Sequence, residues 1–285
     1  MNSLRIKKLT YKTGLYAALA IVALIMVFPF IYLALSSFQP RIALYAKTSV
    51  WEHLFPSQLT LRNWERILSA EFSATWGSTW MFISNSLIAA LGTVGVSMLI
   101  AIFPAYGFAR FLSPFNRVLL QIVLLIYAVP DISIVLPLYQ LLQRIGLLNT
   151  SLGLILALSA RTLPFAIFLL MSFFKELPRD FEDAAQTDGC SRLGAFLRVV
   201  LPMAKAGLAV SAIYAFIGAW SNFVVPQVVV TTQNQFVIPV ALVTMMRAES
   251  IDWTMLVTFG TISTIPCIIF AGYLQKYIAR GLVVG

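Results

Sequence analysis

Two charged residues that interrupt long apolar runs, Asp131 and Arg161, are the first candidates for chemistry in this sequence. Asp131 divides the run 118–142, and Arg161 divides the run 147–174. A charge inside a membrane is costly and marks a functional position by default. Counting 1.5 Å per residue from the expected outer ends of the runs puts both side chains about 15 Å deep, so they could meet across adjacent helices. A structural ion pair and a polar lining for a transport pathway both fit this arrangement.

Other groups that could act in catalysis are scarce. The chain has one histidine, His53, in a polar loop segment, and two isolated cysteines, Cys190 and Cys267. A zinc site or a disulfide framework needs more such residues at closer spacing, and most hydrolase arrangements need a histidine beside the nucleophile. No G-x-x-x-x-G-K-[ST] sequence occurs, so we expect no P-loop nucleotide site. We therefore expect no enzymatic activity, metal or cofactor in this chain.

The composition indicates a protein that crosses a membrane several times. The 285 residues are 60% hydrophobic and only 11% charged, whereas soluble domains have about 25% charged residues. A helix needs about 20 apolar residues to cross the hydrocarbon core. We therefore predict an all-α, polytopic membrane protein with a short N-terminal segment, 1–13, and one transmembrane domain, 14–285. The six predicted spans cover residues 14–37, 81–107, 118–142, 151–174, 206–226 and 253–275.

Lysine and arginine are distributed unevenly between the predicted loops. If the N-terminus lies inside, the inner segments carry thirteen of the 20 basic residues and the outer segments carry six. Basic loops remain on the cytoplasmic side, so both termini and the polar segment 176–202 are predicted to be cytoplasmic. The net charge of +9 forms no stripe along the sequence, which argues against a nucleic-acid partner.

The polar segment, ELPRDFEDAAQTDGCSRLGAFLRVVLP, has the signals of two short helices joined by a turn. Asp180, after Pro178, can cap a helix over 181–187, and Gly189 can form the turn at no steric cost. The apolar spacing of 191–199 predicts the second helix. An amphipathic loop that rests on lipid is the other interpretation, although the acidic first turn disfavours contact with an anionic leaflet.

The same segment resembles the EAA motif of the membrane subunits of ABC importers, E-A-A-x-x-x-G followed further on by an apolar residue, x and L-P. The matching residues are Asp183-Ala184-Ala185, Gly189 and Val199-x-Leu201-Pro202, with Asp183 in place of the usual Glu. Segments 85–111, 136–156, 163–178 and 264–282 are also similar to this family, most closely to the shorter, six-span subunit of its maltose-type group. The resemblance covers nearly the whole chain and implies the type I importer permease fold.

The resemblance also implies partners and a location. Such a subunit forms a translocation pathway with a second, homologous permease and receives a carbohydrate, an oligosaccharide or sugar derivative, from an extracytoplasmic binding protein. Two ATPase subunits bind ATP and Mg²⁺, and the complex lies in a bacterial or archaeal inner membrane. In the family, the motif docks into a cleft of the ATPase. Carried over, the docking residues are Phe181, Glu182, Asp183, Ala184, Ala185, Gly189 and Phe196.

Polar and aromatic residues in the predicted spans are further candidates for the substrate pathway: Asn85, Tyr127, Trp220 and Asn222. The segment Trp220-Ser221-Asn222-Phe223 resembles a W-N-[ED]-[FL] segment of the family. Aromatic rings and amides suit sugars, but packing is the other interpretation, because in the maltose-type group the sugar mainly contacts the partner permease. An arginine at position 161 would favour acidic sugars. The outer loop that contains 233–235 would face the binding protein.

Two other functions remain open. The chain could be a stand-alone, ion-coupled secondary transporter in which Asp131 and Arg161 carry the coupling. It could also be a membrane scaffold or sensor with a cytoplasmic docking hairpin.

Overall fold

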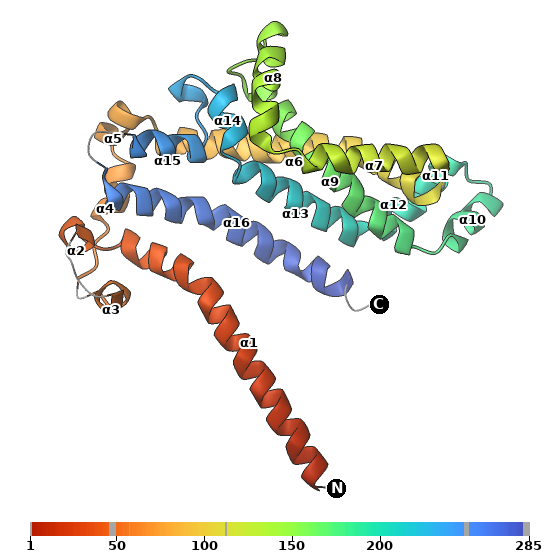
Figure 1. Ribbon diagram of the computed structural model, residues 1–285, viewed down its shortest axis with the longest axis horizontal. Coiled ribbons are helices and arrows are strands. Elements are labelled where there is room, and N and C mark those ends of the chain that lie inside the picture. The colour runs from red at the N-terminus through yellow and green to blue at the C-terminus, as the bar shows by residue number, and fades with distance from the viewer. Residues whose placement is uncertain (1, 46–49, 57, 112, 248–250, 282–285) are drawn as a thin grey trace. The chain divides into compact units, whose positions relative to one another are not determined.

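The structure is a computed structural model that describes residues 2–45, 50–56, 58–111, 113–247 and 251–281 (Figure 1). The regular structure of these residues is entirely helical, which confirms the predicted all-α class. The chain divides into two compact units. The first consists of residues 1–75 and 245–265, and the second consists of residues 76–244 and 266–285.

The first unit is built on one long apolar helix. It contains α1 (Asn2–Ser37), α2 (Arg41–Tyr45), α3 (Val50–Leu54), α4 (Arg62–Ile67), α5 (Ala70–Trp76) and the first part of α16 (Trp253–Gly281). The buried Asn63 amide donates to the carbonyl oxygens of Ser37 at 2.9 Å and Gln39 at 2.8 Å, so the end of α1 has partners for carbonyl groups that no helical turn can pair. In contrast, residues 12–31 of α1 are exposed.

The second unit is a bundle around three helices, α6, α9 and α13, which pack against one another (Figure 1). Its elements are α6 (Thr79–Arg110), α7 (Pro114–Ala128), α8 (Asp131–Arg144), α9 (Ser151–Glu176), α10 (Asp180–Thr187), α11 (Arg192–Ala195), the π-helical turn η1 (Phe196–Val200), α12 (Leu201–Met203), α13 (Lys205–Trp220), α14 (Val224–Val229), η2 (Gln233–Gln235), most of α15 (Ile238–Met246) and the end of α16.

Small residues allow α6 to lie close to its neighbours. Ala89, Thr93, Ser97, Ala101 and Ala105 recur every four residues and are all buried, so they share one face of the helix. Such residues let the backbones of membrane helices approach closely. The hydroxyl groups of Ser97 and Thr162 are 2.8 Å apart in a hydrogen bond that joins α6 to α9.

In the third and fifth predicted spans, the structure has bent or separate helices in place of one straight helix. The apolar run 118–142 is not one straight helix, because α7 and α8 meet at an angle of 97°. Val129 and Pro130 are extended at this bend, as the steric restriction on a residue before proline favours. The predicted span 206–226 ends early, since α13 stops at Trp220 and α14 starts as a separate helix at Val224.

The remaining spans match helices. Runs 14–37, 81–107, 151–174 and 253–275 fall within α1, α6, α9 and α16. Among the described residues, four helices are long and apolar enough to cross a membrane, and the number rises to six if each of two bent pairs is one span. The second bent pair joins α11–α12 to α13 at an angle of 74°.

One close approach in the bundle yields a test of the packing. A Cβ atom added to Gly207 of α13 would lie 2.5 Å from Phe173 of α9, whereas one added to Gly95 of α6 would meet nothing within 4 Å. We expect Gly207→Ala to destabilise the protein by about 1–3 kcal/mol through overpacking. The same change at Gly95 should be neutral or stabilising, because alanine favours helix. Thermal unfolding in detergent measures both, and equal midpoints for the two variants would contradict the packing.

Candidate functional site

The polar segment forms the predicted hairpin. Its first helix, α10, begins at Asp180, which is the first helical residue and not the cap that we predicted. Gly189 has a φ of +90° and makes the turn. Ser191 caps the second helix by accepting a hydrogen bond from the Gly194 N–H at 3.1 Å, and the helix then continues through the π-helical turn η1.

A buried ion pair joins the hairpin to the end of α6. The Arg110 guanidinium binds one carboxylate oxygen of Glu182, and the Tyr106 hydroxyl donates to the other at 2.7 Å. The side chains of Arg110 and Glu182 are only 6% and 9% exposed. Both carboxylate oxygens of Glu182 therefore have hydrogen-bond donors. A buried charge is tolerated only when it is paired in this way.

Two further hydrogen bonds fix the same corner. Arg110 also donates to the Leu177 carbonyl at 3.1 Å, and Arg179 donates to the Arg110 carbonyl at 3.0 Å. The last residue of α6 is thus bonded on both sides to the segment that connects α9 to α10. The hairpin cannot rotate freely about that connection while these bonds persist.

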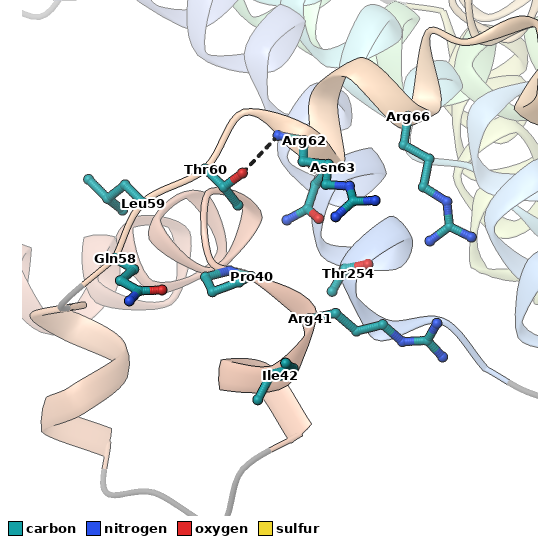
Figure 2. Close-up of a pocket in the computed structure, with 10 residues that line it drawn as sticks. All are labelled: Pro40, Arg41, Ile42, Gln58, Leu59, Thr60, Arg62, Asn63, Arg66 and Thr254. Atoms are coloured by element: carbon teal, nitrogen blue, oxygen red, sulfur yellow. Dashed lines mark hydrogen bonds between the residues drawn. The ribbon is translucent and has the colours of Figure 1, made fainter.

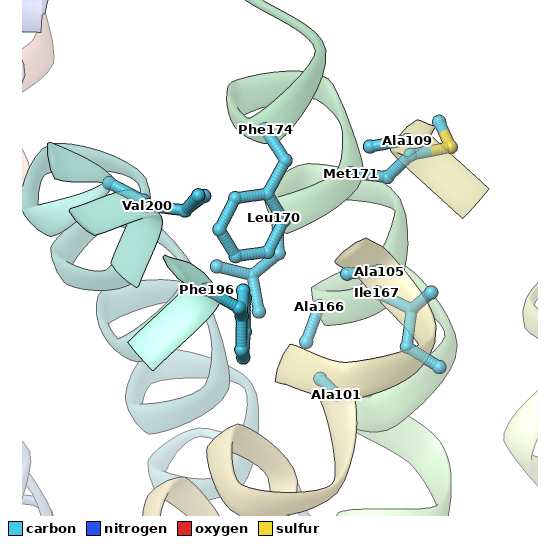
Figure 3. Close-up of a cluster of buried hydrophobic side chains, with 11 residues drawn as sticks. Ala101, Ala105, Ala109, Ala166, Ile167, Leu170, Met171, Phe174, Phe196 and Val200 are labelled. Carbon is cyan, nitrogen blue, oxygen red and sulfur yellow. The ribbon is translucent and has the colours of Figure 1, made fainter. Parts of the chain in front are cut away.

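An apolar cluster supports the second helix of the hairpin (Figure 3). Phe196 and Val200 of η1 pack on Leu170 and Phe174 of α9, next to the alanine face of α6. The Phe196 ring is 4.3 Å from the Tyr106 ring, centroid to centroid. Because Phe196 is 2% exposed, the prediction that it offers an apolar contact to a partner is wrong, and its role is to hold the hairpin against the bundle.

The other predicted docking residues divide into two groups. Glu182 and Ala185 are 7% and 8% exposed and face the bundle, so they too are not surface contacts. Phe181, Asp183 and Ala184 are exposed, as is Gly189. Positions three or four apart share a helix face, and this explains why two adjacent acids, Glu182 and Asp183, differ in environment.

Four of the predicted pathway residues come together at the bend between α7 and α8. Asp131 and Arg161 form an ion pair, as one of our two interpretations predicted. Asn222 donates to the other Asp131 oxygen at 3.0 Å. Arg161 donates to the Tyr127 carbonyl at 2.8 Å and lies 4.8 Å from the centre of the Tyr127 ring. Asp131 starts α8 just after the bend, so a depth calculated for a straight span does not apply to it.

This Asp131 cluster has a specific electrostatic character. Its two charges neutralise each other, and their side chains remain 20% and 24% exposed. Aromatic rings extend it, since Tyr127 stacks on Phe165 at 5.0 Å and Phe165 contacts Tyr214 at 4.5 Å. The cluster therefore combines aromatic faces with a neutral set of polar groups and presents no unpaired positive charge from Arg161.

The remaining pathway candidates have other surroundings. Asn85 donates to the carbonyl oxygens of Asn234 and Phe236 at 2.8 and 3.0 Å, so it fixes the loop that contains η2. Trp220 is 3% exposed and stacks on Phe216 at 5.7 Å. Asn85 therefore serves the η2 loop, and Trp220 packs within α13.

Three important residues were missing from the sequence prediction. Arg110 and Tyr106 belong to the A-Y-x-x-A-R end of the second span, where the tyrosine and arginine lie four residues apart and so on one helix face. Asn149 has a φ of 59°, and its side-chain oxygen accepts from the backbone N–H groups of Thr231 and Thr232. An asparagine in a G-L-L-N-T turn is the signal that was available for this residue.

A pocket of about 550 Å³ in the first unit collects three arginines (Figure 2). Arg62 and Arg66 project from α4 and Arg41 from the start of α2. Arg66 and Arg41 lie 2.7 and 3.9 Å from Asp252. Burial alone would raise the pKa of Asp252, but hydrogen bonds from Thr254 and Arg66 outweigh it and lower this pKa below its usual value.

Comparisons with known proteins agree with the motif. The family described as binding-protein-dependent transport system inner membrane component matches residues 97–284. The chain is 30% identical to the arabinooligosaccharides transport system permease protein AraQ of Halalkalibacterium halodurans, over 93% of this chain and 92% of that protein. It is 31% identical to the trehalose/maltose transport system permease protein MalG of Thermococcus litoralis, again over 93% and 92%.

The fold also has a solved counterpart. A crystal structure of a bacterial ABC transporter involved in the import of the acidic polysaccharide alginate contains a chain with a TM-score of 0.74 and 22% identity, over 94% of this chain and 96% of that one. The likeness extends over most of the chain and is a likeness of fold. The alternative of a stand-alone, ion-coupled transporter has no support in these comparisons.

The difference between the two adjacent acids can be measured. Glu182→Gln keeps the shape of the side chain but leaves the Arg110 charge buried without a counter-charge, which costs about 3–5 kcal/mol. Asp183→Asn changes an exposed group and should stay within about 0.5 kcal/mol of the original protein. Thermal unfolding in detergent provides the comparison. Equal midpoints would mean that the Arg110–Glu182 pair does not hold the hairpin.

The Asp131–Arg161 pair is tested by a double-mutant cycle. Asp131→Asn or Arg161→Gln alone leaves one charge unpaired, whereas the double variant leaves none. We expect the double variant to lose less stability than the sum of the single losses, with a coupling of about 0.5–3 kcal/mol. Strict additivity of the three unfolding free energies would show that the two side chains do not interact.

Proposed function

The chain belongs to the family of binding-protein-dependent transport system inner membrane components, and from this premise we propose that it forms, with a second homologous permease, the translocation pathway of an ATP-driven carbohydrate importer. As a transport permease it is not an enzyme. The ATP and Mg²⁺ that drive transport bind to partner ATPase subunits. The observation that carries the proposal is the hairpin, whose exposed face is held rigidly to two long helices.

Coupling to the ATPase occurs through the outer face of α10. Phe181 is 49% exposed at this face, and Asp183 and Ala184 lie beside it. An apolar ring, a small residue and a charge together suit a cleft in another protein, because aromatic residues dominate interface energies. Since the Arg110–Glu182 pair fixes α10 to α6, a movement of the ATPase is transmitted to the bundle as rigid-body rotation.

A carbohydrate is the substrate class that best fits the chain. The relatives named above transport arabinooligosaccharides and trehalose or maltose by their names. The Asp131 cluster is consistent with this class, because its aromatic rings and amide groups suit hydroxyl-rich ligands. The pairing of Arg161 with Asp131 argues against an acidic sugar held by that arginine.

The membrane arrangement follows from exposure and charge. The apolar residues 12–31 of α1 are exposed, and a patch of this size needs lipid or another subunit to cover it. The basic bias of the inner segments supports a cytoplasmic position for both termini. The loop around η2 follows the fifth predicted span and is available to an extracytoplasmic binding protein.

Reconstitution tests the whole proposal. The chain would be purified with its co-encoded permease, ATPase and binding protein and inserted into liposomes. Uptake of radiolabelled oligosaccharides into the liposomes is expected only when two conditions are met. ATP must be inside, on the side of the ATPase, and the binding protein must be outside. Uptake driven by an ion gradient without ATP would contradict the proposal.

Ala184 provides a specific test of docking. Ala184→Arg places a long charged side chain on the exposed face of α10 and should reduce binding-protein-stimulated ATP hydrolysis by at least about tenfold, the effect of losing roughly 1.4 kcal/mol of interface energy. Ala184→Ser is the matched control and should retain most of the activity. Thermal unfolding of the isolated subunit should be the same for both. Full activity of Ala184→Arg would place the ATPase contact elsewhere.

A further inference from the structure

A basic hollow lies where three helices of the second unit end or begin. It has a volume of about 230 Å³ and is lined by Phe108, Phe111, Ser113, Asn116, Arg117, Leu120 and Lys175. These residues come from the end of α6, the start of α7 and the last turn of α9. The hollow is separate from the Asp131 cluster and from the exposed face of α10.

The charges in this hollow are unbalanced. Arg117 and Lys175 both line it, and its lining contains no carboxylate. Within the described part of the chain, neither side chain forms an ion pair, in contrast to Arg110 and Arg161. Two cations that converge on one cavity attract an anion with more than one oxygen acceptor, and phosphate meets this description.

The depth of the hollow points to lipid as the source of that anion. α6 and α9 are candidate spans that end at Arg110 and Glu176, so the hollow lies at the end where both of these helices leave the hydrocarbon core. Beside the hollow, α7 has no buried residue in the structure. Phe115, Val118 and Leu125 are 69%, 52% and 67% exposed along it. An apolar helix face thus continues from a basic pocket, as in sites that hold an anionic headgroup between membrane helices.

We propose that the basic hollow binds one anionic phospholipid, with Arg117 and Lys175 contacting the headgroup phosphate and α7 contacting an acyl chain. Phe111 connects this site to the hairpin. It lines the hollow and also a second pocket of about 100 Å³ beside Glu182. Its ring lies 5.5 Å from the Arg192 guanidinium of α11. A bound lipid fixes Phe111 and so steadies the hairpin, and this regulatory consequence rests on the proposed coupling function.

Native mass spectrometry of the detergent-purified protein tests the binding itself. Phosphatidylglycerol is titrated against the original protein and against Arg117→Gln/Lys175→Gln. Each lost charge weakens attraction to an anionic lipid by about fivefold, so the double variant should bind about 25-fold more weakly. Arg144→Gln/Lys205→Gln removes the same charge from exposed residues outside the hollow and should bind as the original protein does.

Two results would overturn the lipid site. One is equal retention of phosphatidylglycerol by all three proteins. The other is full displacement of the lipid by millimolar inorganic phosphate, which would make the hollow a site for free phosphate. Phosphatidylcholine carries a phosphate but no net charge, and weak retention of it is the expected result.

Nanodiscs of the assembled complex test the regulatory consequence. Stimulated ATP hydrolysis should rise several-fold when phosphatidylglycerol is added to phosphatidylcholine, and Arg117→Gln/Lys175→Gln should lose this response while keeping its activity in phosphatidylcholine. Equal loss of activity in both lipids would mean that the pair contacts another subunit, and would overturn the proposal. Absence of coupled hydrolysis in the original complex would contradict the permease function alone, since the binding titration does not depend on it.

Discussion

The ion pair between Arg110 and Glu182 is the interaction on which the arrangement of the hairpin depends. Its two side chains are almost fully buried where α6 ends, and each charge would be very costly without the other. The Tyr106 hydroxyl donates to Glu182, and Arg110 also donates to the Leu177 carbonyl. Arg179 reinforces the same corner by donating to the backbone carbonyl of Arg110. A buried pair of this kind adds little net stability, but it strongly restricts the positions that α10 can occupy relative to α6.

The bundle beneath the hairpin gives that restriction its rigidity. In a membrane, helices gain little from the hydrophobic effect when they associate, so close packing and hydrogen bonds must hold them together. The four-residue repeat of small residues on α6, the Ser97–Thr162 bond and the contact of Gly207 with Phe173 all serve this need. The alanines also leave room for the large rings of Phe174 and Phe196, which fill the space between helices and hairpin (Figure 3).

Much of the fold could be predicted because apolar length is a strong signal, and α1, α6, α9 and α16 followed from it. The bend at Pro130 could not be predicted, because a proline does not always break a helix. Pro104 and Pro164 lie inside α6 and α9, and both helices continue through them. Only the packing of neighbouring helices decides which proline breaks a helix. Which side of α10 is buried could not be predicted either. Glu182 differs from Asp183 because it pairs with Arg110, 72 residues away in the sequence. An ion pair between Asp131 and Arg161 was one of two interpretations that the sequence allowed, and the structure contains that pair.

The length of α6 has a mechanical consequence. Its 32 residues make a rod about 48 Å long at 1.5 Å per residue, whereas the hydrocarbon core is about 30 Å thick. The rod must therefore tilt or extend beyond the lipid, and Arg110 stands at its tip. A tilt of about 10° around its midpoint would move that tip by about 4 Å, given a half-length of about 24 Å. A small change in the tilt of α6 is therefore coupled to a displacement of several ångströms at the hairpin.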